Sequence, residues 1–162
     1  MFLTGTQDLK GFVLLNNAIG YMHNYPGVTH HPTEEIILTK LRALSPSETT
    51  SYDKISNQHI AFSHQETTML LHIREAQAGD MIACKHLKTI GASYCTDHWE
   101  HITIEEKDMF PLALAVLRDK DWEEVLAKRV SVIDPIFQKD SLRYYESLYD
   151  YLMSSEMDLN IH

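Results

Sequence analysis

Histidine and glutamate side chains at helical spacing are the residues of this chain best suited to chemistry. The sequence has ten histidines, and two segments combine them with glutamates: HHPTEE at residues 30–35 and HITIEE at residues 101–106. Both segments contain the pattern His-x-x-x-Glu. Because residues four apart on a helix lie on a single face, each segment can direct an imidazole nitrogen and a carboxylate at the same point. The two motifs together indicate a metal site.

Two registers compete in the first segment, His30 with Glu34 and His31 with Glu35. The face that carries His30 and Glu34 continues into apolar residues at positions 37, 41 and 44, whereas the face of His31 and Glu35 soon meets Arg42. The sequence therefore predicts that His30 and Glu34 point to the interior. His31 is expected to be a surface or hydrogen-bonded residue, and Glu35 a solvated charge.

A third inward histidine, His59, shares a helical seam with apolar residues at positions 55, 62, 69 and 73. Buried histidines and glutamates are costly unless they are paired or bind a metal. Carboxylates with neutral imidazoles suit two iron ions inside a helical bundle, or a single ion if the set is incomplete. The candidate ligands are His30, Glu34, His59, His101 and Glu105. His98, His23 and Glu66 lie on the same faces and are candidates for substitute ligands.

The elements that must position these residues are all helical. Amphipathic spacing predicts helices over residues 8–25, 32–43, 48–78, 81–117, 119–128 and 141–154. Pro26 and Pro32 predict a kink or a restarted helix between the first two, and Gly91 is a point where the fourth can break. No segment shows the alternation of a strand. The chain is expected to form a single all-α domain, an antiparallel bundle over about 6–118 with a C-terminal appendage over about 119–162.

Composition excludes several classes of function. The 162 residues carry a net charge of −9 without a basic patch, so nucleic acid is not an expected partner. No apolar run approaches the roughly 20 residues of a membrane span, and no signal peptide is recognisable. Cys84 and Cys95 form neither a disulfide framework nor a zinc motif, which favours a reducing compartment and predicts a cytoplasmic protein. Glu-x-x-His and His-Glu-x-x-His are absent, which disfavours ferritin-like and zincin sites.

The motifs resemble those of the hemerythrin HHE cation-binding family. The resemblance rests on the HHPTEE segment, on Gln58-His59, on Tyr94 seven residues before His101, and on the segment HITIEEKDMFP at 101–111. It covers nearly the whole chain and implies an up-and-down four-helix bundle around a non-haem di-iron centre, a fold for which myohemerythrin is an example. By this resemblance, His30, His59 and His101 are terminal ligands, and Glu34 and Glu105 bridge the two irons.

The sequence differs from the family pattern in one respect: the family's first helix, with its Asp-His pair, has no counterpart here. The segment from Thr6 to Tyr25 resembles the family's second helix, so one iron is expected to lack a ligand and an apolar groove to be uncovered. The implied function is binding or sensing of O2 or NO, or iron handling, and no general base or nucleophile stands apart from the ligands. The alternative is a metal-poor bundle that acts as a structural homodimer through the uncovered groove.

Overall fold

The chain folds as an all-α bundle, which confirms the fold class predicted from the sequence. The computed structural model describes residues 6–131, 134, 145–146, 148–151 and 153–154, and none of these residues lies in a strand. The helices are α1 (Thr6–Asn24), α2 (His31–Leu44), α3 (Thr49–Gln77), α4 (Met81–Ile104), α5 (Phe110–Val116) and α6 (Asp119–Lys128). Short π-helical segments, η1 (Pro26–His30) and η3 (Glu105–Met109), connect α1 to α2 and α4 to α5, and a 3-10 turn, η2 (Pro46–Glu48), precedes α3.

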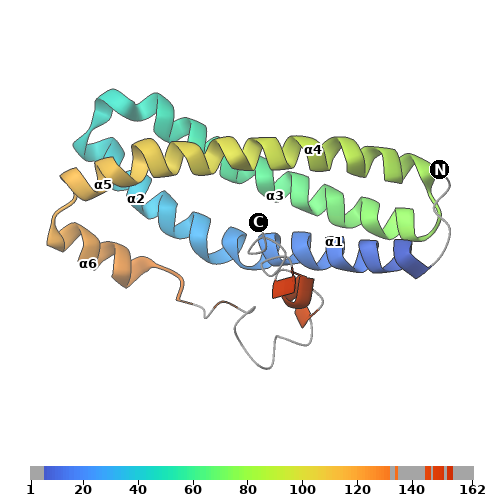
Figure 1. Cartoon of the computed structure of the whole chain (residues 1–162). Helices are drawn as coiled ribbons and strands as arrows, with labels where there is room; N and C mark the ends of the chain where they lie inside the picture. Colours follow the sequence, from blue (N-terminus) through green and yellow to red (C-terminus); the bar gives the residue numbers. More distant parts are fainter. Residues whose placement is uncertain (1–5, 132–133, 135–144, 147, 152, 155–162) are drawn as a thin grey trace, which may run out of the picture.

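Three long rods make up the bundle. Helices α1 and α2 run on through η1 as one bent rod, α3 returns antiparallel to it, and α4 with η3 and α5 runs antiparallel to α3 (Figure 1). Helix α3 is the central rod, since it packs along both α1 and α4. The short helix α6 packs against α2. Within the predicted helix over 141–154, the described residues 145–146, 148–151 and 153–154 are helical, and Tyr145 and Leu148 pack with side chains of α1.

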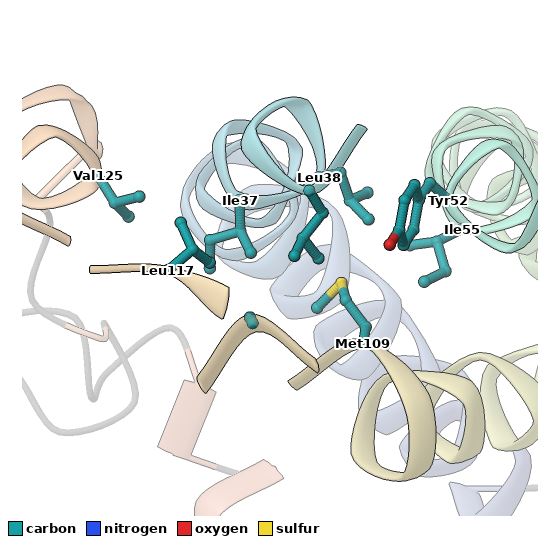
Figure 2. Close-up of a cluster of buried hydrophobic side chains, with 9 residues drawn as sticks. Ile37, Leu38, Tyr52, Ile55, Met109, Leu117 and Val125 are labelled. Atoms are coloured by element: carbon teal, nitrogen blue, oxygen red, sulfur yellow. The ribbon is translucent and has the colours of Figure 1, made fainter. Parts of the chain in front are cut away.

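Two clusters of buried apolar side chains hold the rods together, and they lie on either side of the polar motifs along each rod. One cluster joins α2, the start of α3, η3, α5 and α6, and Figure 2 shows Leu38, Tyr52, Ile55 and Met109 within it. The other joins α1, the rest of α3 and the first part of α4, around Phe62. The histidines and glutamates of the motifs therefore sit between two apolar layers, which fix their positions.

The two π-helical segments are the main differences from the expected helix boundaries. A kink or a restarted helix is expected near Pro26 and Pro32, and the structure has the wide turn η1 there, between the end of α1 and the start of α2. Helix α4 passes Gly91 without a break and ends at Ile104, where η3 begins. π-Helical turns are rare and often occur at functional sites. Here each segment contains a residue of the predicted site, His30 in η1 and Glu105 in η3.

The α3–α4 turn provides a first test of the fold. Asp80 caps α4: its carboxylate accepts hydrogen bonds from the backbone N–H groups of Ile82 at 2.7 Å and Ala83 at 3.2 Å. We expect Asp80→Ala to lower the free energy of unfolding by about 1 kcal/mol, because these donors lose their partner. Asp80→Asn keeps a capping oxygen and should retain most of the stability in urea unfolding. Equal losses in the two variants would contradict the cap.

No helix among the described residues has both the length and the apolar character needed to cross a bilayer.

Candidate metal centre

The structure brings all five predicted ligands into two adjoining groups, to which it adds His31. His31, Glu34, His59 and His101 each place one ligand atom within 4.8 Å of the others, and all four residues are buried. His30, Glu34 and Glu105 form a second group, in which the ligand atoms also lie within 4.8 Å of one another. Helices α2, α3 and α4 contribute to the first group, and η1, α2 and η3 to the second.

Glu34 belongs to both groups and connects them. Its Oε1 lies 2.8 Å from His30 Nε2, and its Oε2 lies 3.4 Å from His59 Nε2. Glu105 approaches from the opposite rod, with Oε1 at 2.8 Å from His101 Nε2 and 3.8 Å from His59 Nε2. Glu34 therefore places one carboxylate oxygen beside a donor of each group.

The ligand atoms lack hydrogen bonds although they are buried and close together. Five such atoms have no partner with hydrogen-bond geometry: Glu34 Oε1 and Oε2, His59 Nε2, His101 Nε2 and Glu105 Oε1. Native proteins hold few buried polar atoms without a partner, because each costs about 1–3 kcal/mol or more. Nitrogen and oxygen atoms that converge in this way, in contact with one another but without hydrogen-bond geometry, are a donor set that can hold a cation. The buried cluster can therefore hold a metal ion.

Side chains behind the ligands fix the imidazoles so that Nε2 faces the centre. His59 donates from Nδ1 to Glu35 Oε1 at 2.7 Å, and Ser56 donates to Glu35 Oε2 at 2.8 Å. His101 donates from Nδ1 to Gln58 Oε1 at 3.2 Å. Such outer partners set the tautomer and orientation of metal-binding histidines. The prediction of Glu35 as a solvated charge is wrong in this respect, since its carboxylate positions His59.

The assignment of His31 to the surface, away from the site, is also corrected. His31 is buried and its ring stacks on that of His59, with centroids 4.3 Å apart and an interplanar angle of 13°. The buried seam of α2 runs through residues 31, 34, 38 and 41, a spacing of three and four, whereas His30 has a side chain that is 55% exposed. Burial, with the nearby imidazoles of His59 and His101, lowers the pKa of His31 to about 3. The ring is neutral at pH 7 and keeps a lone pair for a metal.

Charges in the metal-free centre are arranged around His59. Burial alone lowers the pKa of His59, but the carboxylates of Glu105, Glu34 and Glu35 raise it to about 9. Burial raises the pKa of Glu105, but the imidazoles of His101 and His59 outweigh this effect and lower it to about 2. Without metal, a protonated His59 therefore offsets the buried negative charge.

These shifts predict that metal-free protein is most stable near pH 6.5. Between about pH 4 and 6.5 the unfolded chain takes up protons at His31 and His98, whose pKa values fall to about 3 and about 4 on folding, so stability rises with pH. Between pH 6.5 and about 9 the folded chain keeps a proton on His59 that the unfolded chain has released, so stability falls as pH rises. The slope is roughly 1.4 kcal/mol per pH unit for each proton.

Urea unfolding in the presence of a chelator, between pH 4 and 9, measures this dependence. The Glu105 carboxylate adds stability that is present above its ordinary pKa of 4.5 and lost as pH falls toward about 2, which steepens the acid side. A stability that keeps rising from pH 6.5 to 9 would contradict the charge arrangement.

Of the three candidates for substitute ligands, His23 and Glu66 belong to neither group and contact each other. His23 Nδ1 lies 3.2 Å from Glu66 Oε2, and the Tyr94 hydroxyl donates to Glu66 Oε1 at 2.7 Å. Glu66 is buried, and burial raises its pKa despite these two partners. His98, the third, lies beside His101, with ring centroids 6.2 Å apart, but belongs to neither group.

Two of the cavities that border the centre lie in different grooves between the rods. One, of about 260 Å³, lies between α1 with η1 and α4, and His30, His98, His101 and Glu105 contribute to its wall. The other, of about 610 Å³, lies between α2 and α3 and reaches His31 and His59. Both donor groups therefore have a side on which a small molecule can approach.

No protein-family model matches the chain, and none of the curated proteins or solved structures compared with it gives a match. Its function is therefore inferred from the geometry of the centre and from the resemblance of its motifs.

Proposed function

We propose that this protein holds two iron ions in a non-haem centre of the hemerythrin type and binds a small diatomic ligand, O2 or NO. The observation that carries the proposal is the set of five buried, convergent ligand atoms without hydrogen bonds. The division of the donors into two groups that share Glu34 supports two ions rather than one. The HHPTEE and HITIEE motifs support iron through their resemblance to the HHE family.

Each residue has a distinct role in this proposal. His59 and His101 would hold a metal through Nε2, because their Nδ1 atoms are engaged by Glu35 and Gln58. His31 joins them in the first group, and His30 serves the second group. Glu34 would contribute a ligand to both ions, since it belongs to both donor groups, and the resemblance implies the same role for Glu105.

When bound, two ferrous ions supply the electrons with which dioxygen is held. The protein has three tasks around them: it orients the imidazoles, neutralises the cations with buried carboxylates, and limits access of water. The apolar layers on either side of the centre serve the last task. The cavity of about 260 Å³ suits a ligand of a few atoms.

The test is anaerobic loading with Fe²⁺, followed by metal analysis and exposure to O2 or NO. Two irons per chain, together with the charge-transfer bands of an oxo-bridged diferric centre after oxidation, are the expected result. Protein that stays colourless and metal-free after reconstitution would overturn the proposal.

A metal-poor structural homodimer is the second candidate, and one observation favours it. Trp99 on α4 is 75% exposed, and nearby Ile102 is also exposed, so α4 presents apolar side chains that a second copy can cover. Size-exclusion chromatography of metal-free protein separates the candidates: a dimer that Trp99→Gln dissociates, in protein that takes up no iron, supports the homodimer.

We also infer a cytoplasmic location. Both cysteines, Cys84 and Cys95, are free thiols, as expected in a reducing compartment.

A further inference from the structure

The two donor groups of the centre are unequal. The first has four buried residues, three of them histidines. The second has only three, the half-exposed His30 and the carboxylates of Glu34 and Glu105. The second group also borders the cavity between α1 and α4, where His30 and Glu105 contribute to the wall. An ion held there has fewer protein donors and an open side.

One imidazole on this cavity has buried nitrogen atoms without hydrogen bonds. His98 lies on α4 one turn before His101, and both of its ring nitrogens are buried without a hydrogen-bond partner. The ring packs against aromatic side chains, with its centroid 3.8 Å from that of Phe62 and 4.2 Å from that of Tyr94. A buried polar group without a partner lowers stability, so its presence needs an explanation.

We propose that His98 is a metal ligand, which supplies the second group with a nitrogen donor from the cavity side. The inference rests on the proposed metal centre and extends it to a ligand outside the two His-x-x-x-Glu motifs. His98, His101 and Glu105 follow one another on the same rod at spacings of three and four, so their side chains lie on one face. To bind, the ring turns from the faces of Phe62 and Tyr94 toward the cavity that it already borders.

Titration with Co²⁺ under anaerobic conditions tests the assignment, because the visible spectrum of Co²⁺ reports the number and type of its ligands. Wild-type protein should take up two ions per chain. His98→Leu should take up the first ion normally and bind the second at least about tenfold more weakly, the smallest loss expected for a residue that supports a metal. The control is His86→Leu, which removes an exposed imidazole from the same helix and should change neither ion.

The metal-free protein gives an independent readout in the opposite direction. His98→Leu replaces an unsatisfied polar ring by an apolar side chain, so the metal-free variant should melt about 2–4 °C above wild type. With metal, the order should reverse. A purely structural histidine would lower the melting temperature in both states, which would overturn the proposal.

His98→Ala extends the test by leaving space for an added ligand. Millimolar imidazole should restore the second Co²⁺ ion in this variant and not change the wild type. Two ions bound with unchanged affinity in His98→Leu or His98→Ala would overturn the role of His98 while leaving the metal centre intact. Failure of the wild type to bind any ion would instead overturn the proposed function.

Discussion

Loading with Fe²⁺ is expected to raise the melting temperature by roughly 5–15 °C. A ligand that binds only the folded state, present at about 100 to 1,000 times its Kd, stabilises that state by about 3–4 kcal/mol, and each kcal/mol corresponds to about 2–4 °C at this chain length. The effect should be large here because the metal would also satisfy the five buried atoms without hydrogen bonds. Differential scanning calorimetry under anaerobic conditions, with and without Fe²⁺, measures it.

A chelator should return the melting temperature to the metal-free value, and Mg²⁺ at the same concentration should have little effect, since imidazole ligands select against it. Equal melting temperatures with and without Fe²⁺ would count against any metal centre.

Replacement of Glu34 by Gln is expected to abolish tight binding of both ions. Glu34 is the one described residue that belongs to both donor groups, so its loss removes a ligand from each of them. The affinities should fall by more than the roughly 10- to 100-fold that loss of an outer partner costs. Isothermal titration calorimetry with Co²⁺, together with metal analysis after iron loading, gives the result.

The control for this variant is Glu106→Gln, which makes the same chemical change at an exposed position. It should bind two ions with wild-type affinity. Glu35→Gln should lie between the two, because Glu35 orients His59 through Nδ1 without belonging to either group. A Glu34→Gln variant that still binds one ion tightly would show that Glu34 serves a single ion.

The fold class and the meeting of three motifs were predictable from the sequence because both depend on helical periodicity. Apolar residues at three- and four-residue spacing define the buried seams of α2 and α3, and α3 spans 49–77 where 48–78 is predicted. His59 and His101 lie on such seams, and the structure buries both. An interior residue on a long regular helix is the kind of position that a pattern can locate.

The residues that the sequence placed wrongly lie next to an irregular turn. The face of His30 was extended through position 44 as if the helix were regular, yet Leu44 is exposed and His31 heads the buried seam. The π-helical turn η1 ends at His30, so a uniform rotation of 100° per residue does not hold across the HHPTEE segment. Glu35 and Gln58 were missed as positioning residues because their roles depend on contacts between α2, α3 and α4, which no local pattern contains.

The π-helical turn η3 determines which side chains of α4 and of α5 face the interior together. His101 lies just before η3 and Glu105 begins it. Met109 ends η3, and Ala113 follows in α5. These four residues, spaced four apart, are all buried. Deleting a single residue such as Lys107 would turn everything downstream by about 100° relative to His101. In such a variant, Met109 and Ala113 would no longer face the interior if His101 kept its place there. The number of residues in this one turn thus determines whether chemistry and packing are compatible in the same helix.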